Sequence, residues 1–124
     1  MARAALIRFF LAAALAASIL PAQATEAPYE NNLLRLAEIL GSLQYLRNLC
    51  GEKGDQWREA MEALLITENP GPDRRAQLVA RFNRGYRAYS DMYHTCTASA
   101  TEAIARYMKE GQELSGGTAS RFGN

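Results

Sequence analysis

The sequence contains few of the residues from which metal and catalytic sites are built. Its 124 residues include one histidine, His94, and two cysteines, Cys50 and Cys96. A structural zinc site needs four ligands, usually His or Cys, and these three residues are too few. The two cysteines also lack the C-x-x-C-H spacing of c-type haem attachment. No Ser, His and Asp arrangement can be assigned, so we expect no metal, no cofactor and no enzymatic activity.

A strong charge excess is also missing. The chain has 14 Lys and Arg against 13 Asp and Glu, and its formal net charge is +1. Proteins that bind nucleic acid carry a basic surface, which this balance does not indicate. Hydrophobic residues make up 48% of the chain, which suits one folded domain rather than a disordered segment. We therefore expect a globular protein without a nucleic-acid partner.

The longest apolar run, residues 9–20, lies at the N-terminus behind two arginines. It is followed by Ala22 and Ala24, small residues at the two positions that a signal peptidase recognises. The alternative is a membrane anchor, but about a dozen apolar residues fall short of the roughly 20 that span a bilayer. We predict a cleaved secretory signal peptide at residues 1–24, a periplasmic location and no stable membrane span after cleavage.

Export determines how Cys50 and Cys96 are interpreted. In an oxidising compartment, an isolated pair without metal or catalytic spacing is most simply a structural disulfide. Closing a loop of about 46 residues contributes roughly 4 kcal/mol in the chain-entropy model. The alternative is a redox-active pair, whose cysteines usually lie close together in sequence. We predict that the disulfide staples the fold.

Glycine and proline divide the rest of the chain into helical segments. After a flexible lead at residues 25–29, apolar residues recur at helical spacing over residues 30–50, with Ser42 on the opposite, solvent side. Residues 51–54 break this helix. Asp55 can cap the next one, which ends by residue 69 before a Pro-Gly-Pro turn. The pattern predicts two helices separated by a short turn.

The longest amphipathic pattern covers residues 78–114. The residues that share its apolar face are Leu78, Phe82, Gly85, Tyr89, Met92, Cys96, Ala100, Ala103, Tyr107 and Leu114. Because the phase is kept throughout, we predict one continuous helix that starts near Asp73 and stops at residues 116–117. The alternative is a break within residues 95–101, which are rich in Thr and Ser and include a possible capping box at Ser99.

These segments predict an all-α fold, a helical hairpin or small bundle of three to four helices with a long C-terminal helix. The single domain would span residues 25–114, with a flexible C-terminal tail at residues 115–124. If the disulfide forms and the first helix runs antiparallel, residues 33–46 lie along residues 100–114. The core would then be two helices thick, so we expect either a homodimer or a bend near residues 97–99.

The densest polar stretch, residues 81–87, is the candidate binding site. Arg suits bidentate recognition of carboxylate or phosphate. The candidate partner-binding residues are Arg81, Asn83, Arg84, Tyr86 and Arg87. The alternative is a solvated helix face with ion pairs such as Arg87 to Asp91. Gly85 lies within the apolar stripe, where Gly costs about 1 kcal/mol relative to Ala, and it indicates close approach of another helix.

Four tyrosines form a second pattern, an aromatic band on or beside the apolar face: Tyr86, Tyr89, Tyr93 and Tyr107. Such a band usually belongs to a core or an interface, with the hydroxyl groups reaching polar partners at the edge. The alternative is a wall of a ligand pocket.

Several stretches together carry a family resemblance. They are LRLAEILGSLQYLRNLC at residues 34–50, Trp57, RFNRGYR at 81–87, YHTC at 93–96 and RYMKEG at 106–111. With these stretches the chain resembles a family of small exported alphaproteobacterial proteins of unknown function. The resemblance implies an exported helical domain with paired cysteines, and it carries over no activity, cofactor or catalytic residue.

The function that we expect is therefore non-enzymatic. The leading hypothesis is a cell-envelope adaptor or accessory subunit that binds an envelope protein partner through residues 81–87. The alternative is a protein that binds a small ligand or an anionic cell-wall fragment, with the tyrosine band as a wall and arginines supplying charge.

Overall fold

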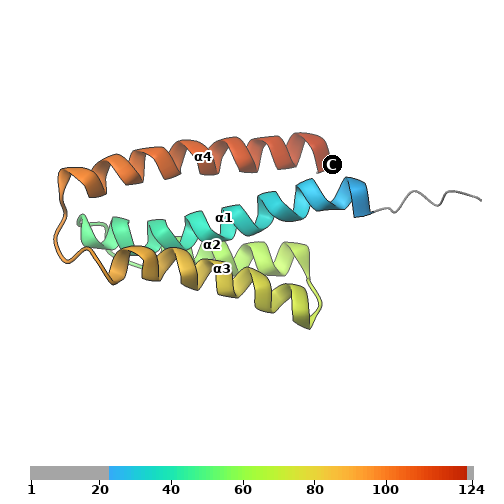
Figure 1. Cartoon of the computed structure of the whole chain (residues 1–124), viewed down its shortest axis with the longest axis horizontal. Helices are drawn as coiled ribbons and strands as arrows, with labels where there is room; N and C mark the ends of the chain where they lie inside the picture. Colours follow the sequence, from blue (N-terminus) through green and yellow to red (C-terminus); the bar gives the residue numbers. More distant parts are fainter. Residues whose placement is uncertain (1–22, 123–124) are drawn as a thin grey trace, which may run out of the picture.

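A computed structural model describes residues 23–122, with side chains placed over residues 27–116, and this part of the chain forms four α-helices. They are α1 (Gln23–Leu49), α2 (Gln56–Glu68), α3 (Pro72–Ser90) and α4 (Ala98–Phe122). Successive helices reverse direction, so α1 runs parallel to α3 and antiparallel to α2 and α4 (Figure 1). The predicted all-α fold is confirmed. The predicted signal peptide lies almost entirely outside the described residues.

The helix around which the fold is arranged is α1, which contacts each of the other three helices. In Figure 1 it lies between α4 and α3. Burial extends around most of its circumference, because Ala37 and Ile39 are fully buried and Ser42 is only 1% exposed. The sequence assignment of Ser42 to the solvent side is therefore wrong. An apolar stripe predicts one buried face, whereas a helix with three neighbours also buries its small polar residues.

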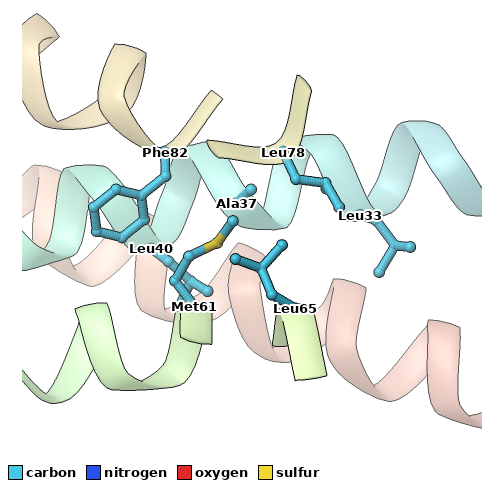
Figure 2. Packing of buried hydrophobic residues seen from close by; sticks show 7 residues of the cluster. All are labelled: Leu33, Ala37, Leu40, Met61, Leu65, Leu78 and Phe82. Atoms are coloured by element: carbon cyan, nitrogen blue, oxygen red, sulfur yellow. The ribbon is translucent and has the colours of Figure 1, made fainter. Parts of the chain in front are cut away.

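Two hydrophobic clusters hold the other helices against α1. In the first, Leu78 and Phe82 of α3 meet Met61 and Leu65 of α2 over α1 residues (Figure 2). The α1 members of this cluster are Leu33, Ala37 and Leu40. The second cluster joins α1 to α4 through Leu46, Ala100 and Ala103, with half-buried tyrosines around them. Burial of such side chains is worth roughly 1.5–3 kcal/mol for each large residue, so both clusters contribute strongly to stability.

The contact between α1 and α3 depends on two glycines. A Cβ on Gly41 of α1 would overlap the main-chain carbonyl of Phe82, and a Cβ on Gly85 of α3 would overlap that of Glu38. Ser42 lies at the same crossing and donates a hydrogen bond to the Gly85 carbonyl over 3.2 Å. The prediction that Gly85 permits close approach of another helix is confirmed.

The start of α2 is capped from another helix. Asp55 occupies the N-cap position, but its side chain makes no capping hydrogen bond, so this prediction is wrong in its detail. Instead, the side-chain oxygen of Gln44 in α1 accepts the backbone N–H of Arg58 over 3.0 Å. The Gln44 amide also donates to the Asp55 carboxylate over 3.2 Å. Gln44 is 4% exposed, and these bonds satisfy its buried amide group.

The predicted continuous helix over residues 78–114 is wrong, because α3 ends at Ser90 and α4 begins at Ala98. The hydroxyl of Thr97, rather than Ser99, caps α4 and accepts the backbone N–H of Ala100 over 3.1 Å. Reversing the chain here lets both halves of the apolar pattern pack against α1, whereas a continuous helix would leave half without that neighbour. Met92, predicted to face inward, lies in the connecting loop and is 74% exposed.

The disulfide between Cys50 and Cys96 is confirmed, with Cα atoms 4.9 Å apart. It joins the turn after α1 to the loop before α4. The expected alignment of residues 33–46 with residues 100–114 is also confirmed, since Leu46 packs with Ala100 and Arg35 pairs with Glu110. The chain reverses over residues 91–97, next to the bend expected near residues 97–99.

Both ends of the described chain are more helical than expected. Residues 25–29, predicted as a flexible lead, belong to α1, whose Tyr29 hydroxyl donates to the Glu68 carboxylate at the end of α2. Contacts with α2 and α3 order this end despite Pro28, since Glu30 also pairs with Arg74 of α3 over 2.7 Å. The helix α4 continues through Gly116 and Gly117 to Phe122, so the predicted stop there is wrong.

Candidate functional site

The solvent-facing side of α3 forms the candidate site, which we call the α3 outer face. Its residues are Ala80, Asn83, Arg84, Arg87, Ala88 and Asp91, which line an open depression of about 480 Å³. Steps of three and four residues place them in one stripe along the helix. The opposite side of α3 carries the buried residues Leu78, Phe82 and Gly85, so packing against α1 fixes which side reaches solvent.

The five candidate residues predicted from the sequence do not share one surface. Asn83, Arg84 and Arg87 lie together on the α3 outer face. Arg81 turns toward α1, where its guanidinium lies 3.3 Å from the Glu38 carboxylate. Tyr86 packs edge-on against the ring of Tyr45 with centroids 5.4 Å apart. The structure thus divides the candidates into three outward residues and two that hold the helices together.

Arg84 and Arg87 are exposed and form no ion pair with any described side chain. The Arg87 to Asp91 pair that the sequence spacing allows is not formed, although both residues line the same depression. Exposed Arg58, Arg75 and Arg106 also lack an ion pair with a described side chain, whereas Arg35, Arg47, Arg74 and Arg81 have acidic partners. Arg74 pairs with Glu30 and Glu68, and Arg47 pairs with Glu52. The α3 outer face therefore presents two neighbouring arginines, Arg84 and Arg87, that no side chain in the described part of the chain pairs with.

Sequence reasoning missed the two alanines of this face. Ala80 and Ala88 lie four residues before and after Arg84, and their spacing is the signal that would have placed them beside it. An alanine has no side chain beyond Cβ, so the surface is low at these positions and higher at the arginines. This relief allows a partner to approach the helix closely.

The tyrosine band contributes mainly to packing. The hydroxyl groups of Tyr89 and Tyr107 are 2.6 Å apart and share a hydrogen bond, and the Tyr45 hydroxyl donates to the backbone carbonyl of Tyr93. Burial and the bond to Tyr107 raise the pKa of Tyr89 above its ordinary value. The band therefore joins the ends of α1 and α3 to α4.

A second hollow lies between α1, α2 and α4. It has a volume of about 180 Å³, and its lining is mostly apolar, with Ile39, Leu40 and Leu43 of α1, Trp57 of α2 and Met108 of α4. Gly111 also lines it, and a Cβ there would lie 3.5 Å from Ile39, an ordinary contact distance. This space is suited to a small apolar molecule.

The described residues contain no group of three or more His, Cys, Asp or Glu side chains placed to hold a metal ion. His94 is exposed in the loop between α3 and α4, in agreement with the prediction that it faces solvent. Within residues 23–122, none of the helices is both long and apolar enough to cross a membrane.

Comparisons with known proteins place the chain in a family without assigning an activity. Neither a search of curated proteins nor a search of solved structures found a match. A family model matches residues 28–122, which is more than half of the chain and includes all of α2 and α3. The match covers the cysteine pair, the glycine crossing and the α3 outer face. The chain therefore belongs to the DUF2385 family, which is described as a protein family of unknown function.

Proposed function

We propose that this protein is an exported, non-enzymatic partner-binding protein of the cell envelope that uses the α3 outer face to bind another protein. The observation that carries the proposal is that Arg84 and Arg87 are both exposed and neither pairs with a carboxylate of the described residues. Other arginines on the same helix, Arg74 and Arg81, are used to bind α3 to the rest of the fold.

Export is part of this proposal and has separate support. The N-terminal sequence has the pattern of a signal peptide, and disulfides such as Cys50 to Cys96 persist in oxidising compartments such as the bacterial periplasm. Protein sequencing of the envelope form should give Thr25 as the first residue. An uncleaved N-terminus, or free thiols at both cysteines, would argue against export.

Affinity capture from envelope extract tests partner binding. The wild type is compared with an Arg84→Ala, Arg87→Ala double variant, and an Arg106→Ala variant serves as the control. Arg106 is exposed on α4 and forms no ion pair with a described side chain, so its replacement removes an exposed positive charge from a different helix. We expect the double variant to lose a partner that the wild type and the control both retain. Equal recovery by all three proteins would exclude this face.

The second candidate function is the binding of a small apolar ligand in the hollow between α1, α2 and α4. Its volume of about 180 Å³ is similar to that of an engineered cavity of roughly 150 Å³ that binds benzene. In a thermal-shift assay with short-chain alkyl and aromatic compounds, a ligand at 100 times its Kd should add about 2.7 kcal/mol of stability. A Gly111→Leu variant, which narrows the hollow, should abolish such a shift. The tyrosine band is a weaker candidate for binding glycans, because the Tyr89 and Tyr107 hydroxyl groups already bond to each other.

A further inference from the structure

The charges on α3 point to the chemistry of the partner. This helix contains five arginines and one aspartate, so its net charge is 5 − 1 = +4. The preceding helix, α2, contains three glutamates and one arginine, so its net charge is 1 − 3 = −2. Since the whole chain is nearly neutral, positive charge is concentrated on one helix.

Ion pairs to neighbouring helices neutralise two of the other arginines of α3. Arg74 lies 2.7 Å from Glu30 and 3.1 Å from Glu68, and Arg81 lies 3.3 Å from Glu38. No described carboxylate lies within ion-pair distance of Arg84 or Arg87. The one acidic residue on their face is Asp91, which lies at its C-terminal end. Arg75, at the start of α3, is also exposed without an ion pair to a described side chain, but it lies outside this face. Within the α3 outer face, the positive charge without an ion pair is that of Arg84 and Arg87.

The shape of the face suits a polypeptide segment. From Ala80 to Asp91 it extends over about 16 Å of helix axis at 1.5 Å per residue, or three turns. The low positions at Ala80 and Ala88 allow contact with a partner backbone, and the amide of Asn83 can both donate and accept hydrogen bonds. Each guanidinium can hold a carboxylate through two parallel hydrogen bonds.

We propose that the α3 outer face binds an acidic segment of a protein partner, with Asp or Glu carboxylates paired to Arg84 and Arg87. This inference rests on the proposed function. A membrane surface is a poorer fit, because lipid binding uses clusters of cations beside large apolar side chains, and this face has alanines and an aspartate instead. A nucleic acid would require a more extensive basic surface.

Site-specific photo-crosslinking in the cells that produce the full-length protein tests the inference. A photo-reactive phenylalanine derivative replaces Ala88, and the crosslinked peptides are identified by mass spectrometry. We expect them to come from a protein segment with at least two Asp or Glu residues within about three helical turns. The crosslink yield should fall about tenfold in the Arg84→Ala, Arg87→Ala background, as expected for loss of paired charges, and should not change with Arg106→Ala.

A second measurement uses a synthetic peptide of the crosslinked segment. Its affinity for the purified protein should fall about tenfold when its acidic residues are replaced by amides, and severalfold when salt rises from about 50 mM to about 300 mM. An Arg84→Lys, Arg87→Lys variant should bind more weakly than the wild type but more tightly than the alanine variant, because lysine keeps the charge and loses the bidentate geometry. Circular dichroism checks that each variant is folded.

The outcomes separate the two proposals. Capture of a partner combined with crosslinks to a segment without acidic residues, to lipid or to glycan would overturn the acidic-segment inference and leave partner binding intact. Capture of a partner without any crosslink from position 88 would do the same. If the wild type captures no partner and gives no crosslink, both proposals fail.

Discussion

Gly85 of α3 lies directly against the main-chain carbonyl of Glu38 in α1, so that a Cβ at this position would be 2.9 Å from the carbonyl carbon and would overlap its oxygen. A Gly85→Ala variant should therefore be less stable. Helix propensity favours alanine by about 1 kcal/mol, but overpacking of this kind typically costs about 1–3 kcal/mol or more. Urea denaturation would measure the difference. Gly111→Ala is the matched control, because its Cβ would make an ordinary contact and should be neutral or stabilising.

The disulfide should contribute a large part of the stability. Replacing Cys50 and Cys96 together by serine should lower the free energy of unfolding by about 4 kcal/mol, because the open loop increases the entropy of the unfolded chain. Denaturation with and without a reductant would measure this. Reductant should destabilise the wild type and leave the double variant unchanged. Equal stability of the reduced and oxidised wild type would contradict the prediction.

The pair between Arg35 and Glu110 should make the attachment of α4 sensitive to acid. Glu110 accepts hydrogen bonds from Nε and Nη2 of Arg35 over 2.7 and 2.9 Å, and these bonds lower the pKa of its carboxyl below the ordinary 4.5. A depressed folded-state pKa stabilises the protein above the unfolded pKa, and this contribution is lost as pH falls through the folded pKa.

A Glu110→Gln variant tests this pH dependence. Both side chains of the pair are partly exposed, so its loss at neutral pH should cost at most about 1 kcal/mol. The difference in unfolding free energy between the wild type and the variant should decrease below pH 4.5 and vanish once the wild-type Glu110 carboxyl is protonated. Glu113→Gln is the control, because Glu113 is exposed further along α4 and pairs with no described arginine. Thermal unfolding across the acid range would provide the comparison.

The phenol of Tyr89 should lose its proton at a higher pH than an ordinary tyrosine. Burial and the hydrogen bond with Tyr107 raise its pKa above the ordinary 10.0, so the folded state favours the neutral phenol. This contribution to stability is present below pH 10 and is lost as pH rises through the folded pKa. Burial and the bond to Glu68 likewise raise the pKa of Tyr29 to about 12.

A Tyr89→Phe variant should lose about 1 kcal/mol of stability at neutral pH together with one late-titrating phenol. Ultraviolet absorbance of the tyrosinate form would follow the titration. Tyr86→Phe is the control, since the Tyr86 ring packs against Tyr45 while its hydroxyl makes no hydrogen bond to a described residue. An unchanged alkaline titration in Tyr89→Phe would assign the late phenol to another residue.

Local signals in the sequence predicted much of this fold. Gly51 and Gly54 adopt positive φ angles in the break after α1, and Pro72 begins α3 after the predicted turn. Gly85 could be recognised from the sequence because glycine is unfavourable inside a helix. In the structure it allows α1 and α3 to approach closely, as expected. These signals are the conformational preferences of single glycine and proline residues, so they can be recognised without knowing the neighbouring helices.

The missed features depend on tertiary contacts. The reversal over residues 91–97 was hidden because the apolar pattern happens to keep its phase across it. Ser42 and Gln44 are buried because three helices surround α1, and no pattern within α1 shows this. At the candidate site, the density of polar residues over 81–87 grouped five candidates, of which only Asn83, Arg84 and Arg87 line the α3 outer face. The inward roles of Arg81 and Tyr86 depend on Glu38 and Tyr45, which are some 40 residues away in sequence.

The unequal distribution of contacts around α1 has a consequence for local unfolding. The helices α1, α2 and α3 share one hydrophobic cluster, whereas α4 packs mainly on α1 through alanines and half-buried tyrosines. Amide hydrogens of α4 should therefore exchange with solvent through a partial opening that leaves the other three helices folded. The disulfide keeps Cys96 beside Cys50 in this partly opened form. The C-terminal end of α4 would therefore separate first, and α4 would repack rapidly because its N-terminal end stays close to α1.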